Sequence, residues 1–403
     1  MNYFYSRPGF AFFMGFVFPY LLTKIEFVYT VGNISEKTES LILIAVLAFF
    51  VGLVSCYLLW LLKNCFFRTK SVPVSQVRLV HRPILLWGLF SWFFLACACL
   101  FYEFYLLGGI PILSKDVESL RFSMQVNGYV HLLAISLGIV SSLLIVTASF
   151  DQGLVRIQVF LVGLFGFFLL SLTGNRSDFM LMLAILCIFF VLNRDRMISL
   201  KWTIAGCVFI SAFVLMKFYR EIAFGVDYMG MIDEQLIGEP SAIKYAVYPL
   251  YLTLTYGFMV FDWLVEAGLD GLEGGRYTFY AFYSLLPGHQ MDFGTYKNQM
   301  LGIDFYAELT STFVSNFYVD FGAFGVFLGS FSLAVLLGAV YRKAKMDRRF
   351  TLLYSILYLY TLIFFYVYIY VYFISFVAIG AFAFYCVFFL RRSVPDEASY
   401  AEN

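Results

Sequence analysis

The chain has 403 residues, of which 62% are apolar and only 13% are charged, and its mean hydropathy is +0.84. A soluble domain is typically about half apolar and about a quarter charged, so this composition excludes an ordinary soluble protein and indicates a polytopic membrane protein. The net charge of +1 identifies no partner, because membrane proteins distribute charge between the two sides of the bilayer. No basic stripe with interleaved aromatics lies outside the loops that flank the membrane, so nucleic acid is not an expected partner.

Seven apolar stretches precede residue 217, and each is a candidate for a membrane span, which needs about 20 mostly apolar residues. The predicted spans are Phe10–Thr30, Leu41–Leu62, Ile84–Leu107, Val130–Phe150, Val155–Leu172, Phe179–Leu192 and Trp202–Met216. Basic residues follow the second and the sixth of these spans, which places both loops in the cytoplasm under the positive-inside rule. The first span contains Lys24 and Glu26, which could pair or reach the membrane surface.

Residues 217–321 interrupt this pattern because they are rich in charged residues, Tyr and Gly, and we expect them to form a large loop on the outer face. The apolar middle of the loop, Tyr245–Val265, is long enough to cross the membrane. A single extra crossing would place the following basic residues outside, against the charge rule. We therefore expect a re-entrant or interfacial segment, with Asp262 facing protein or water, since irregular backbone is tolerated at this depth only when shielded from lipid.

Three further spans are predicted after this loop: Gly322–Val340, and two helices within Phe350–Leu390 that are separated by a tight turn near Tyr370. The expected fold is therefore all-α, with about ten transmembrane helices and both ends inside, or twelve if two more crossings occur. The expected parts are an N-terminal block of seven spans (1–216), the large outer loop with re-entrant or interfacial helices (217–321), and a C-terminal block of three spans with a short cytoplasmic tail (322–403).

Arg176 lies in a polar turn, Thr173-Gly174-Asn175-Arg176-Ser177-Asp178, between the fifth and sixth predicted spans. Placing a charged side chain in hydrocarbon costs a free energy of about 2.5–3.5 kcal/mol at mid-depth and less near the interface. An arginine at this position therefore indicates an ion pair or a bound anion. One interpretation is an ion pair with Asp178 within the turn. The other is an anion site, because a guanidinium binds phosphate through two parallel hydrogen bonds and Gly174 lets the backbone come close.

Two other arginines are predicted to lie at the outer surface. Arg121 follows the third span and shares its loop with Lys115, so both cations could bind one anion, although the neighbouring carboxylates could equally neutralise them. Arg220 follows the seventh span by about one turn, and the alternative for it is a local ion pair with Glu221.

His289 is the one histidine predicted to lie in an outer loop, in the turn Leu286-Pro287-Gly288-His289 beside Asp292. A neutral imidazole suits a general base, and an aspartate could orient it, although an ordinary loop histidine is the alternative. Of the other two histidines, His131 lies inside the fourth predicted span and His81 flanks the third. Six tyrosines of the outer loop could stack on sugar rings or belong to an aromatic belt at the membrane surface: Tyr277, Tyr280, Tyr283, Tyr296, Tyr306 and Tyr318.

Several familiar signatures do not occur. We find no phosphate-binding glycine loop, no HExxH, no Cys/His cluster and no Asp-x-Asp, so neither a metal nor a cofactor is expected. No pair of cysteines falls in a predicted outer loop, so no disulfide is expected either. Any chemistry should use a donor that arrives already activated and bound to lipid.

Three short motifs resemble bacterial oligosaccharide repeat unit polymerases of the Wzy type. Gly108-Gly109-Ile110-Pro111 followed by Arg121 resembles their GGIP…R segment, and Thr173-Gly174-Asn175-Arg176-Ser177 resembles their G-x-R turn. Residues 318–325, Tyr-Val-Asp-Phe-Gly-Ala-Phe-Gly, resemble the Y-x-DFG-x-x-G sequence at the start of the span after the large outer loop. The number of spans and the single large outer loop also resemble that family, which is similar in plan to the O-antigen ligases.

The resemblance implies a GT-C-like membrane glycosyltransferase in the bacterial cytoplasmic (inner) membrane, with its active site facing outward. The donor would be a glycan on undecaprenyl pyrophosphate and the acceptor a second lipid-linked repeat unit, with a chain-length regulator and a flippase as partners in addition to the bilayer. Because charge grows on the leaving pyrophosphate, fixed cations aimed at it would lower the barrier. Arg121, Arg176 and Arg220 would bind it, and Arg276, Lys297 and Tyr318 would add substrate contacts. His289 or Asp320 would take the hydroxyl proton, although Asp320 could instead cap a helix before Gly322.

Three alternatives remain open at this point. An O-antigen-ligase-type transferase would join finished glycan to another acceptor, and its product would distinguish it. A flippase or transporter of lipid-linked glycan would want charges inside the spans and paired half-repeats, which the sequence does not suggest. A lipid-linked sugar transferase could use a carboxylate base in the first outer loop, at Glu36 or Glu39.

Overall fold

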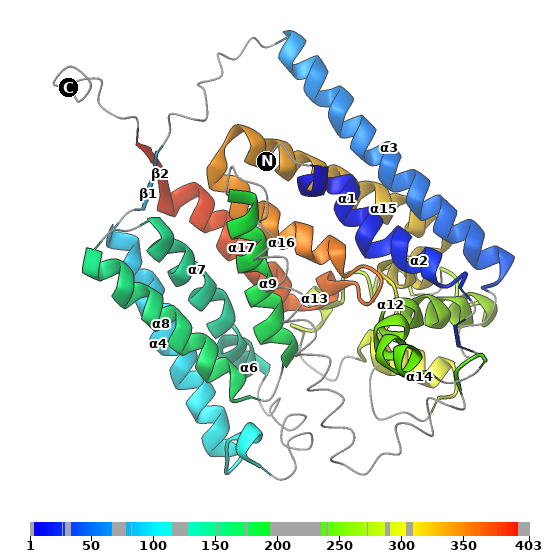
Figure 1. Cartoon of the computed structure of the whole chain (residues 1–403), viewed down its shortest axis with the longest axis horizontal. Coiled ribbons are helices and arrows are strands. Elements are labelled where there is room, and N and C mark those ends of the chain that lie inside the picture. The colour runs from blue at the N-terminus through cyan, green and yellow to red at the C-terminus, as the bar shows by residue number, and fades with distance from the viewer. Residues whose placement is uncertain are drawn as a thin grey trace. The chain divides into compact units, whose positions relative to one another are not determined.

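The computed structural model describes residues 4–25, 27–28, 34–66, 78–81, 83–114, 128–150, 153–173, 176–193, 235–238, 241–271, 273–286, 291–303 and 309–393. These residues are mainly helical and divide into two compact units, which we describe separately (Figure 1). Unit 1 comprises Met1–Phe67, Arg194–Ala339 and Tyr360–Phe373. Unit 2 comprises Arg68–Asn193, Val340–Leu359 and Ile374–Asn403.

Five of the described helices are long and apolar enough to cross a membrane: Glu36–Leu62, Leu86–Leu106, Gly128–Phe150, Leu154–Ser171 and Phe313–Met346. Shorter apolar helices occupy Pro8–Leu22, Phe179–Asn193 and Phe373–Phe389. All eight fall on predicted spans, so the protein is a multi-pass membrane protein. The seventh predicted span, Trp202–Met216, lies outside the described residues, and a total of about ten spans stays a prediction.

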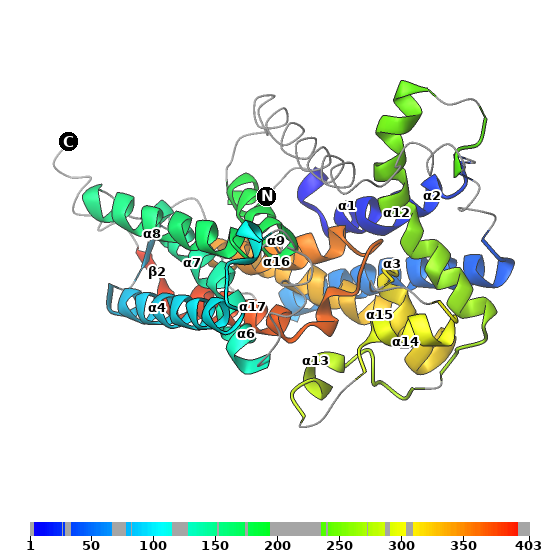
Figure 2. The ribbon, with the colours of Figure 1, turned by 90° about the horizontal axis from the view of Figure 1, so that it is seen from below.

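Unit 1 combines helices from both ends of the chain. Its elements are a 3-10 turn (Phe4–Ser6), α1 (Pro8–Phe12), a π-helical turn (Phe13–Val17), α2 (Phe18–Leu22), α3 (Glu36–Phe66), α12 (Ala242–Glu266), α13 (Tyr280–Tyr283), α14 (Phe293–Met300), most of α15 (Phe313–Met346) and a 3-10 turn (Ile369–Val371). Helix α12 packs against α2 and α3 (Figure 2). It contains the segment Tyr245–Val265, which forms one continuous helix through Pro249, and its position at the membrane surface stays a prediction.

Aromatic rings form the core of unit 1. The ring of Phe12 stacks on that of Phe49 at a centroid distance of 3.8 Å, which holds α1 against α3. The ring of Phe313 stacks on that of Phe364 at 4.2 Å, which holds the start of α15 against the turn after α16 (Thr351–Leu362). Offset and stacked pairs of this kind add about 0.5–1.5 kcal/mol each beyond their buried area.

Unit 2 is built around α7. Its elements are β1 (Arg78–His81), α4 (Pro83–Leu106), a 3-10 turn (Pro111–Leu113), α6 (Gly128–Ile135), α7 (Leu137–Phe150), α8 (Gly153–Ser171), α9 (Arg176–Asn193), a 3-10 turn (Arg348–Phe350), most of α16, α17 (Phe373–Phe384), a π-helical turn (Tyr385–Phe389) and β2 (Leu390–Ser393). Helix α7 packs against α4, α8 and α9 and is buried along most of its length. It carries no charged residue, as expected of a helix that is covered on all sides.

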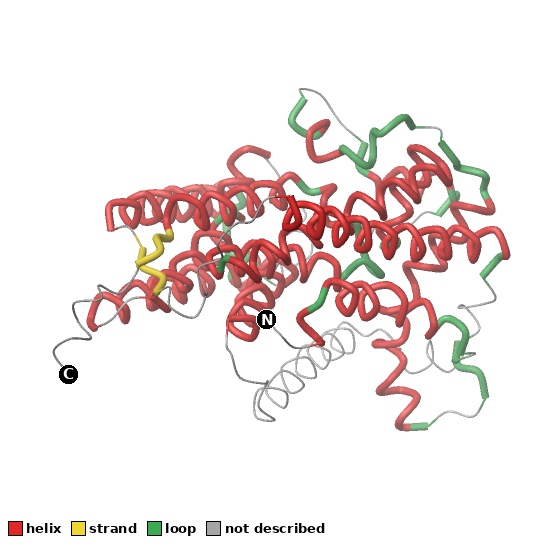
Figure 3. The backbone as a smooth tube through the Cα atoms, turned by 90° about the horizontal axis from the view of Figure 1, so that it is seen from above, coloured by secondary structure: helices red, strands yellow, loops and turns green. Residues whose placement is uncertain are grey.

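Strands β1 and β2 form a two-stranded antiparallel sheet, drawn in yellow in Figure 3, in which Arg78 pairs with Ser393 and His81 with Leu390. The predicted all-α fold did not include this pairing, because each strand is only four residues long and carries no alternating pattern. The pairing joins the loop after the second span to the end of the last apolar run. Both segments were predicted to lie in the cytoplasm. The sheet shows that they lie together, and the side of the membrane stays a prediction.

The final apolar run is divided as predicted. Helices α16 and α17 are separated by residues 363–372, which contain the 3-10 turn Ile369–Val371, so the expected break near Tyr370 is confirmed. The break is broader than the tight turn that the sequence suggested.

Helix α15 starts earlier than the predicted span and is kinked at Gly322. The backbone of Gly322 has φ 62° and ψ −151°, a conformation that is essentially restricted to glycine. A Cβ atom added to Gly322 would have its nearest neighbour at 3.9 Å. Glycine is therefore required by the backbone conformation and not by crowding.

We predict that Gly322→Ala lowers the free energy of unfolding by about 1–3 kcal/mol, because alanine is strained at this φ and ψ. The thermal unfolding midpoint of the detergent-solubilised protein measures the loss. Gly380→Ala in α17 is the matched control, since the backbone of Gly380 has no positive φ and an added Cβ atom would meet nothing within 4 Å. Equal midpoints for the two variants would contradict this explanation of the kink.

Candidate functional site

The motif Gly108-Gly109-Ile110-Pro111 ends α4 and turns the chain. Gly108 has a φ of 70°, and the N–H groups of Gly108 and Gly109 donate to the carbonyl oxygens of Tyr105 and Phe104 at 3.2 and 3.1 Å. This is the double hydrogen bond of a Schellman C-cap, in which glycine supplies the left-handed conformation. Pro111 then opens a 3-10 turn, so the motif is a helix stop that directs the next residues away from α4.

The turn after this motif is joined to the turn that precedes Arg176. The N–H group of Ile112 donates to the carbonyl oxygen of Leu172 at 3.2 Å. Thr173, next to Leu172, is buried and donates its hydroxyl to the carbonyl oxygen of Leu170. Arg176 is the first residue of α9. We call this part of the molecule, from Leu106 to Leu113 and from Leu172 to Arg176, the Arg176 end of unit 2.

The two outer cations predicted for this region belong to unit 2, but their side chains are not described. Arg121 lies outside the described residues, and only the backbone of Arg176 is described. The hydrogen bond between Ile112 and Leu172 brings together the starts of the two polar segments that carry these arginines. An anion near the first residues of α9 would also face the positive end of the helix dipole.

A buried carboxylate and an imidazole meet at the same end of unit 2. The Nδ1 atom of His131 in α6 lies 3.0 Å and 3.3 Å from the two carboxylate oxygens of Glu103 in the last turn of α4. Glu103 is 3% exposed, whereas the His131 side chain is 19% exposed. Sequence reasoning noted that His131 lies inside a span but gave it no role and overlooked Glu103. Ionisable residues within apolar spans were the signal that could have found both.

In unit 1, Asp320 holds the loop that precedes α13. Its buried carboxylate accepts hydrogen bonds from the main-chain N–H groups of Tyr277, at 3.2 Å, and Thr278. Its carbonyl oxygen accepts from the N–H group of Gly274, and the carbonyl of Tyr318 accepts from Gly271. The Y-x-DFG motif therefore attaches residues 271–278 to α15.

This arrangement bears on the two roles predicted for Asp320. The interpretation as a helix cap before Gly322 is wrong, because both carboxylate oxygens bind the backbone of residues 277 and 278 instead. A role as general base stays a prediction. Main-chain N–H groups already bind both carboxylate oxygens of Asp320, which favours a positioning role.

Three other predicted substrate contacts belong to the same loop region. The ammonium group of Lys297 is buried and donates to the carbonyl of Leu309 and, at 3.0 Å, to the hydroxyl of Ser311. The guanidinium of Arg276 is half-buried and lies 5.7 Å from the ring centre of Tyr277. Tyr318 is buried, with the ammonium of Lys37 at 5.9 Å from its ring centre. Contact of Lys297, Arg276 and Tyr318 with substrate stays a prediction.

The tyrosines of this loop are mostly used in packing. Tyr277, Phe293 and Tyr296 are buried against one another, with ring centroids 4.6 to 6.3 Å apart. Burial, together with the negative charge of Glu273, raises the pKa of both phenols, to about 12 for Tyr296. These hydroxyls therefore stay protonated at working pH and can donate hydrogen bonds. The faces of Tyr277 and Tyr296 are covered, so stacking on sugar rings fits the more exposed Tyr283 better.

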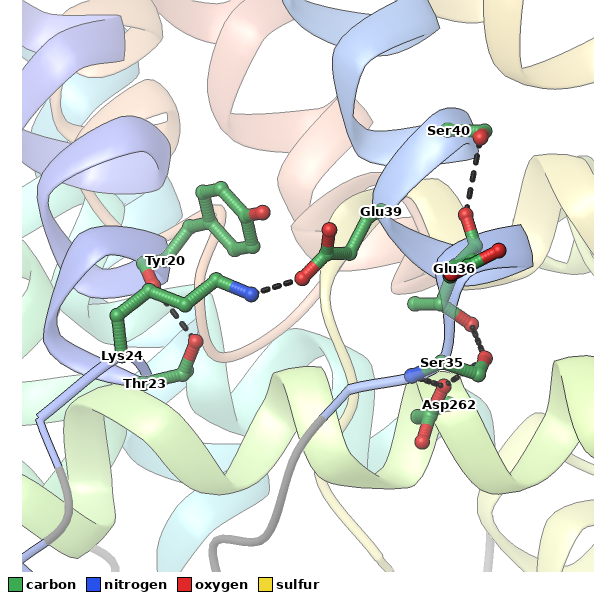
Figure 4. Close-up of polar contacts among 9 residues, drawn as sticks. Tyr20, Thr23, Lys24, Ser35, Glu36, Glu39, Ser40 and Asp262 are labelled. Atoms are coloured by element: carbon green, nitrogen blue, oxygen red, sulfur yellow. Dashed lines mark hydrogen bonds and ion pairs between the residues drawn. The ribbon is translucent and has the colours of Figure 1, made fainter.

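A second polar group of unit 1 surrounds the start of α3 (Figure 4). The carboxylate of Asp262 in α12 accepts hydrogen bonds from the N–H and the hydroxyl of Ser35, at 3.1 and 2.6 Å. Of the two predicted surroundings, protein or water, Asp262 therefore faces protein. Lys24 forms an ion pair with Glu39. Glu36 and Glu39 are the two carboxylates that could serve as the base of the alternative sugar transferase. Of these, Glu39 is bound to Lys24 in the ion pair.

The remaining predicted residues, His289 and Arg220, lie in the unit 1 segment but outside the described residues. Within the described residues, no three His, Cys, Asp or Glu side chains gather in a way that could hold a metal ion.

A family model of O-antigen polymerases matches residues 8–380, which is nearly the whole chain. The chain belongs to the O-antigen polymerase family. Comparison with curated proteins and with solved structures found no match. The family match spans both units and includes the Gly108–Pro111 turn, the Arg176 turn and the Y-x-DFG motif, so all three belong to the part of the chain that is common to O-antigen polymerases.

We predict that Asp320→Asn lowers the free energy of unfolding by about 1.5–3 kcal/mol, because the amide can accept only one of the two N–H bonds and loses the charge. The thermal midpoint of the solubilised protein measures this. Asp292→Asn is the matched control. Asp292 also accepts a main-chain N–H, from Thr295 at 2.8 Å, but as the N-cap of α14, where asparagine serves equally well. Similar midpoints for both variants would contradict the holding role of Asp320.

Proposed function

We propose that this protein is a membrane glycosyltransferase that polymerises oligosaccharide repeat units carried on undecaprenyl pyrophosphate. The observation that carries the proposal is the match to the O-antigen polymerase family over residues 8–380. The apolar helices of both units support it, because a substrate with a long polyprenyl tail must be handled at the bilayer. The proposal further places the active site on the outer face of the cytoplasmic membrane, on the strength of the distribution of basic residues.

In the proposed reaction, a hydroxyl of the acceptor sugar attacks the anomeric carbon of the donor, and undecaprenyl pyrophosphate leaves. Negative charge develops on the leaving oxygen, so the enzyme needs cations fixed in place before the reaction. We assign Arg176 and Arg121 to the pyrophosphate, and expect Arg220 to join them. The hydrogen bond from Ile112 to Leu172 supports this assignment, because it joins the described residues that precede the two arginine-bearing segments.

Arginine suits this role better than lysine. Its guanidinium presents parallel N–H groups to two phosphate oxygens, and it is always charged. The donor carries its own activation in the pyrophosphate ester, so the proposed chemistry needs no metal. Arg276, Lys297 and Tyr318 are proposed to add substrate contacts. Lys297 binds the carbonyl of Leu309 and the hydroxyl of Ser311, whereas Arg276 and Tyr318 take part in cation–π contacts.

A ligase of related plan would use the same donor and differ in its acceptor. The product therefore distinguishes the two functions: a polymerase lengthens the lipid-linked glycan, whereas a ligase transfers finished glycan to a different acceptor. A chain-length regulator and a flippase are the proposed protein partners, since a polymerase on the outer face depends on the delivery of repeat units.

We predict that Arg176→Ala lowers the rate of polymerisation about 10²–10³-fold, the usual loss when one donor to a developing oxyanion is removed. In cells that rely on this polymerase, single lipid-linked repeat units should accumulate and the ladder of longer chains should vanish from a gel. Arg176→Lys should recover only part of the activity, because it keeps the charge and loses the paired hydrogen bonds.

Arg156→Ala is the control, since Arg156 is exposed near the start of α8, at the opposite end of that helix from Leu172. This variant should form a normal ladder. A normal ladder from Arg176→Ala at equal protein abundance would exclude the assignment of Arg176 to the pyrophosphate.

A further inference from the structure

The contact between Glu103 and His131 has no part in the reaction proposed above for Arg176 and Arg121. It joins the last turn of α4 to the first turn of α6 through a bifurcated contact of 3.0 and 3.3 Å. Both residues lie in helices that are apolar enough to cross a membrane. Ionisable side chains in such helices are rare and costly, and they commonly mark a functional site.

Packing alone does not require this pair. Helix α4 is already joined to the residue between α6 and α7 by a hydrogen bond from the indole nitrogen of Trp92 to the hydroxyl of Ser136, at 2.8 Å. A buried carboxylate is a poor way to gain stability, because its desolvation cost commonly offsets the attraction to its partner. Glu103 is 3% exposed, so that cost is nearly complete.

The geometry prepares His131 to accept a proton. With Glu103 as a carboxylate, which can only accept hydrogen bonds, the Nδ1 atom donates to it and Nε2 carries the lone pair. A carboxylate partner of this kind fixes the tautomer and the orientation of an imidazole. Among the described residues no hydrogen bond to Nε2 occurs, and the side chain is 19% exposed, so a substrate hydroxyl could reach it.

The pair also lies at the Arg176 end of unit 2. Glu103 precedes the Schellman turn at Gly108 by five residues, and that turn leads to the hydrogen bond between Ile112 and Leu172. A base at this end would therefore belong to the same compact unit as the proposed pyrophosphate-binding arginines. His289, the base that the sequence suggested, belongs to unit 1.

We propose that His131 is the general base of the reaction and that Glu103 positions it. This inference rests on the proposed function. As the acceptor oxygen forms its bond to the anomeric carbon, its proton passes to Nε2 of His131. The bond between the anomeric carbon and the phosphate oxygen breaks, and its electron pair leaves with the pyrophosphate. The imidazolium then returns the proton to water, and the carboxylate of Glu103 stabilises the transient positive charge.

This role makes activity depend on pH. An imidazole can act as a base only in its neutral form, so acidic conditions should lower the rate. Besides Glu103, α4 contributes Cys99, which interacts with the Glu103 charge, and α6 contributes the exposed Tyr129. Helix α7 contributes no titratable side chain. Arg176 and Asp178 open α9, and their side chains lie outside the described residues.

The test uses the full-length protein in liposomes, with a repeat unit on a polyprenyl pyrophosphate as both donor and acceptor. His131→Gln keeps a polar amide of similar size and lacks a basic nitrogen. It should lower kcat by about 10²-fold or more, leave KM nearly unchanged and abolish the acid limb of the pH profile. Glu103→Gln should lower kcat by about 10- to 100-fold, the usual effect of losing a carboxylate that orients an imidazole. Trp92→Phe removes the hydrogen bond from α4 to Ser136, the residue that follows α6, and should behave like wild type.

The outcomes separate a catalytic role from a structural one. Wild-type kcat and an intact acid limb in His131→Gln would overturn the inference, and so would an equal loss in Trp92→Phe. Loss of the acid limb in His289→Gln but not in His131→Gln would return the role to His289. If the wild-type protein itself does not lengthen the lipid-linked glycan, the proposed function fails instead, and that result is read from the product before any variant is compared.

Discussion

A polar group that leaves water at the edge of a membrane must find its partner inside the protein, and this constraint explains most of the polar contacts seen here. Three buried carboxylates illustrate it. Asp262 accepts from Ser35 at the start of α3, Asp320 accepts from the backbone of residues 277 and 278, and Glu103 faces His131. The first two bind groups that cannot titrate, so they order backbone. Glu103 binds an imidazole, which can exchange protons, and it therefore stands apart.

The same constraint orders the turns that carry the family motifs. The Schellman turn at Gly108 satisfies the last carbonyls of α4, and Ile112 then satisfies the carbonyl of Leu172. Each turn thus closes its own hydrogen bonds. In unit 1 the Y-x-DFG motif has a comparable role, since it attaches Gly271, Gly274, Tyr277 and Thr278 to α15 while Gly322 kinks the helix. The described parts of the motifs fix the backbone, and two of the motifs also contain the arginines assigned to the pyrophosphate, Arg121 and Arg176.

The sequence predicted the spans well because a run of about 20 apolar residues has few alternatives in a membrane. It also located the polar turns, whose glycines need particular backbone conformations. It could not name the partner of Asp320, which lies 43 and 42 residues away, or that of His131, 28 residues away, because side-chain partners depend on helix packing. The short strands β1 and β2 were not predicted because each has only four residues and no alternating pattern. The roles of Arg121, Arg220 and His289 stay predictions.

An experimental structure of the protein in lipid, with a polyprenyl pyrophosphate donor bound, would show directly whether the pyrophosphate binds at the Arg176 end of unit 2. We expect phosphate oxygens within hydrogen-bonding distance of the Arg176 guanidinium, at about 2.7–2.9 Å. Pyrophosphate held by Arg276 and Lys297, with Arg176 paired to Asp178 and away from the ligand, would contradict it.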